Sequence, residues 1–429
     1  MAEIPVPTPS AEPSLLQAEF DRDPYPFYAL LRERFPVVHD ERMGCWLLSR
    51  YDDVRAGFAD PRLSSEAYAL RLEPMMGRTI SQMDGRAHTA HRKVVTPAFN
   101  GRALQQWREI TTAISRELVE QLRGRPEIEL VAEFCRELPV RTMAAVLGLP
   151  LSDGPAVQRW TRGTTAQLDN IRQDPGIMRD GLAAGQALFE YLGPHIAQRR
   201  RSPGPDLLST LCAATVDGEP LSDDAVLGFA SLLLAAGSET TAAGLATLFA
   251  NLLEHPDQLA AVRADPALVP RAWAEAIRRN PPVQFEMRQS TEELLIGPER
   301  HRIPSGAPVA LLIGAANRDP ARFADPDRFD LFRADAHIDR AFTAAATHVG
   351  FGAGRHFCLG AQLSLTEAEA AVPLLLEALP KPAFAEGVGP GYVGRMLRGP
   401  EKLLVTTGWL APELLGTQRK SGGQSHLFD

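Results

Sequence analysis

Apolar residues recur at three- and four-residue spacing through most of the chain after residue 86, which is the pattern of helices with one buried face. This pattern predicts long helices over residues 102–123, 131–147, 177–201 and 222–254. Breaker residues separate them, such as Ser202-Pro-Gly-Pro205 after the third stretch and His255-Pro256 after the fourth. The chain is therefore predicted to be mainly α.

A smaller part of the chain has a strand-rich pattern. Near the amino end, the pattern predicts short helices at residues 26–33 and 51–59 and two hairpin strands at residues 36–40 and 45–49. After residue 280, strands and loops predominate, with a buried strand at residues 309–313, and a helical pattern returns only after Cys358. We thus expect a mainly α fold with a smaller β-rich region.

The length of 429 residues exceeds one ordinary hydrophobic core, so it suggests two or three domains, with a single large helical domain as the exception. The sequence shows no internal repeat. Residues 1–14, which are rich in proline, are expected to form a flexible arm, and the polar residues 412–429 a flexible tail.

Composition indicates the cellular compartment and argues against some classes of partner. The four cysteines, Cys45, Cys135, Cys212 and Cys358, lie far apart without a Cys-x-x-Cys pair, which favours a reducing compartment over a disulfide framework or a zinc site. The start carries no signal peptide pattern, and the longest apolar stretch, residues 226–237, is too short to span a bilayer. A net charge of −8 argues against general nucleic-acid affinity. A soluble, cytoplasmic protein is expected.

One cysteine lies in a glycine-rich loop directly before a predicted helix. The loop reads Phe351-Gly-Ala-Gly-Arg-His-Phe-Cys358-Leu-Gly360, and good helix formers follow over residues 361–371. Free backbone N–H groups and the dipole at a helix start lower a thiol pKa, so Cys358 is predicted to be a thiolate that acts as a ligand or nucleophile. Gly352 relaxes the loop, and Gly360 lets the backbone approach the sulfur closely.

Two simpler interpretations of this loop are a phosphate-binding loop and a buried structural cysteine. The third glycine of a dinucleotide-binding pattern is absent, because Phe357 stands there, and no Gly-Lys-Ser/Thr follows. A structural role is the usual one for an intracellular cysteine and stays open for Cys358 taken alone.

A second unusual segment, Leu232-Leu-Leu-Ala-Ala-Gly-Ser-Glu-Thr-Thr241, lies in the middle of the longest predicted helix. Ala236 and Thr240 are four residues apart and share a face, which Gly237 adjoins, so this face has a shallow notch beside a hydroxyl. The threonine can also bond the carbonyl of the preceding turn. A close helix crossing allowed by small residues is the structural alternative.

The cysteine loop fits the haem-binding signature Phe-Gly-x-Gly-x-His-x-Cys-x-Gly, and the chain resembles the cytochrome P450 family from about residue 23 to residue 409. The resemblance implies the P450 fold, a triangular prism with haem b between the long central helix and the cysteine-ligand helix, in a single haem domain over residues 15–411. It implies that Cys358 is the proximal ligand of the haem iron, where a thiolate favours O–O cleavage. It also implies that Glu239 and Thr240 deliver protons to dioxygen.

The resemblance further implies which residues surround the cofactor. The two haem propionates need cationic or hydrogen-bonding partners, and the residues at the family's positions are His88, Arg92, Arg288 and His356. Other expected cofactor contacts are Phe351, Gly352, Gly360, Ala236 and Gly237.

Glu275 and Arg278 are three residues apart, so they can pair on one helix face, although such pairs are common on solvated surfaces. The resemblance implies that they join an arginine of a later segment in a buried triad that holds the cysteine loop. Arg328 is the expected third member, and Arg333 is the alternative. The implied role is structural.

The implied function is that of a haem-thiolate monooxygenase. It would insert one atom of O2 into a C–H bond or a double bond of a medium-sized hydrophobic metabolite, with electrons from a separate ferredoxin or flavodoxin. The expected basic patch for this partner comprises Lys93, Arg102, Arg108 and Arg355. A monomer without nucleic-acid or membrane partners is expected. The alternatives are peroxygenase, isomerase or coupling chemistry on the same fold, and a haem-free helical interaction protein.

The substrate itself is not indicated by the sequence. The expected pocket residues are Leu232, Ala236, Val283, Phe285, Glu286 and Val393, and their apolar majority favours a hydrophobic molecule. Glu286 has two interpretations that stay open. It either faces the pocket and favours a cationic or hydroxylated ligand, or it pairs with a nearby arginine.

Overall fold

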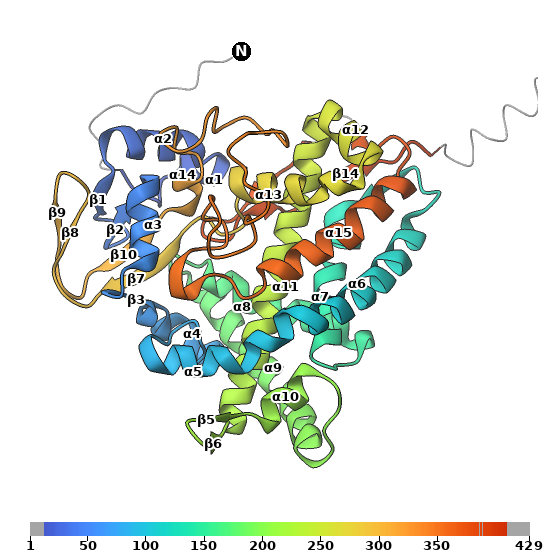
Figure 1. Ribbon diagram of the computed structural model, residues 1–429, viewed down its shortest axis with the longest axis horizontal. Coiled ribbons are helices and arrows are strands. Elements are labelled where there is room, and N and C mark those ends of the chain that lie inside the picture. Colours follow the sequence, from blue (N-terminus) through green and yellow to red (C-terminus); the bar gives the residue numbers. More distant parts are fainter. Residues whose placement is uncertain (1–12, 386, 388, 410–429) are drawn as a thin grey trace, which may run out of the picture.

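Helices make up most of the computed structural model, which describes residues 13–409 apart from residues 386 and 388 (Figure 1). The helices are α1 (Ala18–Arg22), α2 (Tyr25–Arg34), α3 (Tyr51–Ala59), α4 (Ala69–Met76), α5 (Gly85–Val95), α6 (Gly101–Leu122), α7 (Glu137–Val146), α8 (Gly154–Leu168), α9 (Pro175–Arg201), α10 (Leu207–Ala213), α11 (Asp223–Glu254), α12 (Pro256–Ala264), α13 (Val269–Arg279), α14 (Ile313–Ala316) and α15 (Ala361–Ala378). The predicted mainly α class is confirmed.

The strands are short and gather mainly on one side of the molecule (Figure 1). They are β1 (Val37–Asp40), β2 (Cys45–Leu48), β3 (Leu63–Ser64), β4 (Glu127–Glu129), β5 (Thr215–Val216), β6 (Glu219–Pro220), β7 (Glu286–Ser290), β8 (Leu294–Ile296), β9 (His301–Ile303), β10 (Pro308–Leu311), β11 (Ala383–Phe384), β12 (Tyr392–Val393), β13 (Gly399–Pro400) and β14 (Leu404–Thr406). The largest sheet has the order β1-β2-β10-β7-β3, in which β10 runs parallel to β2 and the other pairs are antiparallel.

Helix α11 runs through the middle of the molecule, and the other long helices lie around it (Figure 1). Ser222 caps its start by accepting a hydrogen bond from the Ala225 N–H at 3.2 Å. In the described part of the chain, α11 is the one helix that is long and apolar enough to cross a membrane, by length and composition alone. The sequence had indicated only a shorter apolar stretch, at residues 226–237, within this helix. However, 61% of its most apolar window is buried inside the protein, as in a core helix.

Two glycines let α11 cross its neighbours closely. A Cβ on Gly237 would lie 2.7 Å from the Met143 sulfur of α7, and a Cβ on Gly244 would lie 2.5 Å from the Trp273 ring of α13. Both distances are shorter than normal Cβ contacts, so a larger residue at either position would force the neighbouring side chain to move. The close helix crossing considered from the sequence is therefore present at Gly237.

Most predicted elements appear within two or three residues of their expected bounds, including α2, β1, β2, α3, α6, α9 and α11. The helix expected over residues 131–147 instead begins with a π-helical turn, Val131–Cys135, before α7. The strand expected over residues 309–313 ends at Leu311, because Ile313 begins α14.

The packed body begins before residue 15. Ser14 is buried, and the Leu15 N–H donates to Asp40 Oδ2 at 2.7 Å, so these residues belong to the core rather than to a flexible arm. The remainder of the predicted arm, residues 1–12, and the predicted tail, residues 412–429, lie outside the described residues.

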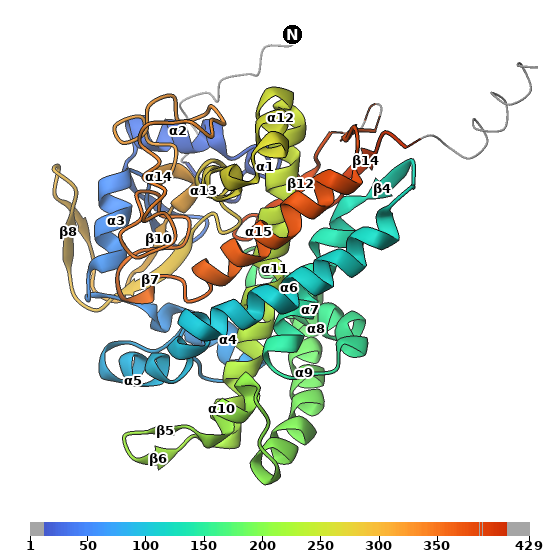
Figure 2. The same cartoon turned by 45° about the vertical axis from the view of Figure 1, so that its right-hand side comes forward.

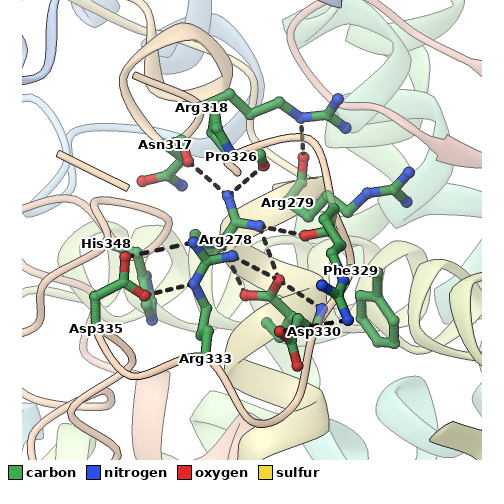
Figure 3. A network of polar contacts seen from close by, with 12 residues as sticks. Arg278, Arg279, Asn317, Arg318, Pro326, Phe329, Asp330, Arg333, Asp335 and His348 are labelled. Carbon is green, nitrogen blue, oxygen red and sulfur yellow. Dashed lines mark hydrogen bonds and ion pairs between the residues drawn. The ribbon is translucent and has the colours of Figure 1, made fainter. Parts of the chain in front are cut away.

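A buried ion network joins α13 to the long loop that precedes the cysteine (Figure 3). Arg278 donates from Nε to Glu275 Oε2 at 2.7 Å and from Nη2 to Oε1 at 2.8 Å. The rest of its guanidinium donates to the backbone carbonyls of Asn317 and Pro326 at 2.9 and 2.8 Å. Because every charge has close partners, the network can be buried and holds the loop against α13.

The third arginine of this network is Arg333, not Arg328. Arg333 Nη1 lies 3.1 Å from Glu275 Oε1, and its Nε donates to Asp335 Oδ1 at 2.6 Å. The Arg328 side chain is 67% exposed and lies 4.0 Å from Asp330, while only its backbone carbonyl accepts from Arg278. The turn between these residues points the later side chain inward, so the expectation for Arg328 was wrong and the alternative is correct.

Replacing the two arginines one at a time should change the free energy of unfolding to very different extents. Arg333→Ala leaves Glu275 and Asp335 short of a buried partner and should lower the free energy of unfolding by about 3–5 kcal/mol. Arg328→Ala removes an exposed side chain and should change it by less than about 0.5 kcal/mol. Urea unfolding followed by circular dichroism measures both, and an Arg328→Ala variant as damaged as Arg333→Ala would contradict this assignment.

Candidate active site

The loop that carries Cys358 is shaped by its own backbone. The Cys358 N–H donates to the Phe351 carbonyl at 2.9 Å. Gly352 and Gly354 have φ angles of +69° and +67°, and a Cβ on Gly354 would lie 2.8 Å from the Phe58 carbonyl oxygen. Only glycine suits these two positions. The loop thereby presents the Cys358 sulfur to a cavity.

This cavity lies between the middle of α11 and the start of α15 and encloses about 340 Å³. Cys358 lines it together with Glu239 and Thr240 of α11. The predicted cofactor contacts line it as well, namely Phe351, Gly352, Gly360, Ala236, Gly237, His88, Arg92, Arg288 and His356. The structure thus brings together in one place residues that are up to about 270 positions apart in the sequence.

Opposing effects act on the pKa of the Cys358 thiol. Burial raises its pKa, and this effect outweighs the hydrogen bonds from the Gly360 and Ala361 N–H groups and the charge of Arg92, which lower it. The backbone at the helix start acts in the predicted direction, and the thiolate stays a prediction. A metal ion bound at the sulfur would supply positive charge and displace the proton.

Cationic and imidazole groups gather at one edge of the cavity. Arg92 of α5 donates to the Phe357 carbonyl at 2.6 Å, which ties it to the cysteine loop. Arg288 of β7 is buried and lies over the Phe58 ring at 5.5 Å. The His88 and His356 rings lie 4.1 Å apart, and burial lowers the pKa of His88 to about 4. His88 is therefore neutral at pH 7.

Asp84, which sequence reasoning missed, holds this edge together. Its Oδ1 accepts from His356 Nε2 at 3.1 Å and from Arg355 Nε at 3.2 Å. Its Oδ2 accepts from the Ser64 hydroxyl and the Ser65 N–H at 2.7 and 2.8 Å. Burial acts to raise the pKa of Asp84, but these hydrogen bonds hold it well below its usual range. Asp84 lies four residues before His88, which was a signal near the predicted motif.

These residues fit a flat cofactor with acidic groups at one edge. The His88 Nε2 is buried and has no hydrogen-bond partner within the described residues, so it is left to bind something in the cavity. A Cβ on Gly360 would meet nothing closer than the Cys358 sulfur at 3.9 Å, so the space beside the sulfur is open in the protein. The arginines and histidines suit propionates, and the sulfur suits iron.

Glu239 and Thr240 lie on the α11 wall of the cavity. The Thr240 hydroxyl donates to the Ala236 carbonyl at 2.7 Å, as predicted for a threonine at this position. Glu239 Oε1 accepts from the Thr161 hydroxyl of α8 at 3.2 Å. Burial raises the pKa of Glu239, while Thr161 and the charges of Arg162 and Arg136 lower it. The hydrogen bond from Thr161 to Glu239 could not be predicted from the sequence, because it joins two different helices.

The residues predicted for the substrate pocket line the cavity only in part. Leu232, Ala236, Val283 and Glu286 line the cavity. Phe285 does not, because side chains alternate along an extended strand and it points into the core between α2 and the sheet. Val393 is 46% exposed on β12 and is replaced at the cavity wall by Met396 and Leu397.

Three of the four residues predicted for a basic patch are exposed. Lys93 and Arg102 are exposed on α5 and α6. Arg108 is exposed too but lies 2.5 Å from Glu369 of α15, beside which α6 runs (Figure 2). Arg355 is not a free surface cation, because its side chain is 25% exposed and pairs with Asp84.

Within the described residues, Cys358 is the one cysteine that lines this cavity, which suits a cofactor held through a sulfur. The cytochrome P450 family model matches residues 164–379. Pulcherriminic acid synthase of Bacillus subtilis (strain 168) is 34% identical over 394 residues, which cover 91% of this chain and 97% of that protein. The chain belongs to the cytochrome P450 family. Its cofactor is haem b.

Other relatives share the family and the fold. Cyclomarin C epoxidase CymV of Salinispora arenicola (strain CNS-205) is 34% identical over 343 residues, which cover 79% of this chain and 84% of that protein. The solved structure of cytochrome P450 CYP109Q5 from Chondromyces apiculatus has a TM-score of 0.81 at 32% identity, with 92% of this chain and 97% of that chain covered. The P450 fold and an oxidoreductase activity are thus shown.

A buried acid on α15 has no role in the sequence predictions. Glu367 is 2% exposed, and its Oε1 has no partner within the part of the chain that the structure describes. Burial raises the pKa of Glu367 to about 8 from the usual 4.5. The folded protein therefore keeps this proton at neutral pH.

This proton predicts a pH dependence of stability. Below about pH 4.5 Glu367 is protonated in both states, but between about pH 4.5 and 8 only the unfolded chain loses the proton, so stability falls as pH rises. Glu367→Gln should remove this fall, which is on the order of a few kcal/mol. Urea midpoints at pH 5 and pH 8 measure it, and Glu377→Gln, at an exposed site on the same helix, is the control. An equal fall in wild type and Glu367→Gln would contradict it.

Proposed function

We propose that this protein is a haem-thiolate monooxygenase that inserts one atom of dioxygen into a C–H bond or a double bond of a medium-sized hydrophobic metabolite. The observation that carries the proposal is that Glu239 and Thr240 line the same cavity as the Cys358 sulfur. An acid and an alcohol beside an oxygen site suit proton delivery, which oxygen insertion needs and simple oxygen storage does not. An epoxidase among the relatives supports it.

The residues around the cavity have two proposed roles. Some hold the cofactor, and others move protons. Bound haem b supplies the site at which dioxygen is reduced and its O–O bond is broken. The Cys358 sulfur would bind the iron and donate electron density to it. Arg92, Arg288, His88 and His356, which line the cavity, would hold the propionates by charged and neutral hydrogen bonds.

Glu239 and Thr240 handle the protons. A raised pKa lets the Glu239 carboxyl hold a proton closer to neutral pH than an exposed glutamate does. The Thr240 hydroxyl, which donates to the Ala236 carbonyl, can turn on its Cβ and donate into the cavity instead. Apolar side chains such as Leu232, Val283 and Met396 keep bulk water from this site.

Labelled dioxygen tests the reaction class. Compounds that bind are first found by the spectral shift that they cause, and the product of turnover under ¹⁸O2 is then analysed by mass spectrometry. We expect one ¹⁸O atom in the product. Turnover that leaves the product unlabelled would overturn the proposal in favour of isomerisation or coupling.

Variants of the two proton-handling residues should fail in different ways. Glu239→Gln should lower turnover about a hundredfold, because a general acid typically contributes this much. Thr240→Ala should still consume electrons and oxygen but release hydrogen peroxide at the expense of product. Measured ratios of product to consumed electrons separate these effects, and Thr165→Val at another cavity threonine is the control. Normal coupling in Thr240→Ala would contradict its role.

We further propose that a small acidic ferredoxin or flavodoxin delivers electrons at the surface of Lys93, Arg102 and Arg108. This surface adjoins the cysteine loop, since Arg92, next to Lys93, binds the Phe357 carbonyl and Arg108 pairs with Glu369 of α15. Such a position suits electron transfer to the iron from the cysteine side.

This docking surface predicts a salt effect. Turnover at limiting ferredoxin should weaken as salt rises from about 0.01 to 0.15 M, since screening shortens the reach of exposed charges. Lys93→Glu and Arg102→Glu should raise the ferredoxin concentration needed by about tenfold, while Arg302→Glu on the distant β8–β9 hairpin should not. Salt-insensitive turnover would contradict the surface.

A further inference from the structure

The cavity contains a carboxylate that the proposed mechanism does not use. Glu286 begins β7 and lies on the same face of this strand as Arg288, toward the cavity. Tyr68 lies beside it and also lines the cavity. The Tyr68 hydroxyl donates to Glu286 Oε2 at 2.5 Å and accepts from the Met287 N–H at 2.9 Å. Both hydrogen-bonding functions of this hydroxyl are thereby taken.

One oxygen of Glu286 remains available. Its Oε2 receives Tyr68 and, at 3.5 Å, Arg288 Nη1, whose shorter bond goes to the Met287 carbonyl at 2.7 Å. Its Oε1 accepts no hydrogen bond from the described residues. The side chain is 31% exposed, so this oxygen is reached from the cavity. The pairing with an arginine that the sequence left open is therefore weak and one-sided.

The surroundings of Glu286 make its chemistry selective. Neighbouring parts of the cavity wall are apolar and include Leu72, Met76, Val283 and Met396. An ionised carboxylate only accepts hydrogen bonds, and in an apolar cavity an accepting oxygen without a donor is costly. A ligand that supplies a donor there is stabilised, and a ligand that presents an acceptor is repelled.

We propose that Glu286, fixed by Tyr68, is a specificity-determining residue that binds a hydrogen-bond donor of the substrate, either a hydroxyl, an amide N–H or an ammonium group. The inference rests on the proposed function, because it assumes that haem occupies the cavity beside Cys358. The donor anchors one end of an otherwise apolar molecule, which leaves the remainder over the cofactor. An ammonium group binds most tightly, because both partners are then charged.

Probes that bind the iron directly allow a test without knowing the substrate. Phenylimidazoles that carry a methyl, hydroxymethyl or aminomethyl group at the meta or para position are titrated, and their spectral shifts give dissociation constants. In wild type, the hydroxymethyl or aminomethyl probe at one ring position should bind about tenfold more tightly than its methyl counterpart. Glu286→Gln should abolish the aminomethyl preference, and Glu286→Leu both preferences, with the methyl probe changed less than about twofold.

Control measurements distinguish a failure of this inference from a failure of the proposed function. Glu293→Gln, at an exposed carboxylate paired with Arg302, should keep wild-type preferences. Tyr68→Phe should reduce the preference without removing it. The reduced, carbon monoxide-bound spectrum is recorded for every protein, and its failure in wild type would sink the proposed function rather than this inference. If Glu286→Leu loses haem, Glu286→Gln decides.

Three outcomes would overturn the inference. The first is a wild type that shows no preference at either ring position. The second is an aminomethyl preference that survives Glu286→Gln, or a hydroxymethyl preference that survives Glu286→Leu. The third is an equal loss of affinity for all three probes in Glu286→Gln, because Glu286 would then support the haem rather than the substrate.

Discussion

The Cys358 sulfur lies at the wall of the cavity, where it must carry a negative charge to bind iron. Desolvation acts to raise the pKa of its thiol, while backbone N–H groups at the start of α15 and the Arg92 guanidinium act to lower it. A metal ion at the sulfur would add positive charge there, so cofactor binding and thiolate formation would be one event. The loop geometry serves this event, since Gly352 and Gly354 bring the sulfur to the cavity without blocking it.

The rest of the molecule keeps that sulfur in place. The loop before Cys358 has little regular structure, and the buried network of Glu275, Arg278 and Arg333 takes the place of regular hydrogen bonding there. Such a network contributes little net stability compared with apolar packing, but breaking it strands a buried charge. It therefore specifies one loop conformation. Asp84 has the same function on the other side of the loop, through Arg355 and His356.

Local motifs with fixed spacing could be predicted from the sequence. The cysteine loop, the Glu275–Arg278 pair and the helix with Glu239 and Thr240 each lie within about ten residues, and the long helices follow from apolar periodicity. Partners from distant segments could not be predicted. Tyr68 with Glu286, Thr161 with Glu239 and the inward turn of Arg333 depend on how separate elements pack. The prediction that Phe285 lines the pocket was wrong, because the sequence of a short strand does not show which of its side chains face the cavity and which face the core.

The central claim is that the Cys358 sulfur binds haem iron as a thiolate, and the absorption spectrum of the reduced, carbon monoxide-bound protein tests it most directly. A strongly red-shifted Soret band reports thiolate ligation. We expect this band in the wild type and its absence in Cys358→Ser, with folding unchanged by circular dichroism. A well-folded, haem-loaded wild type without the shifted band, or a Cys358→Ser variant that retains it, would contradict the account.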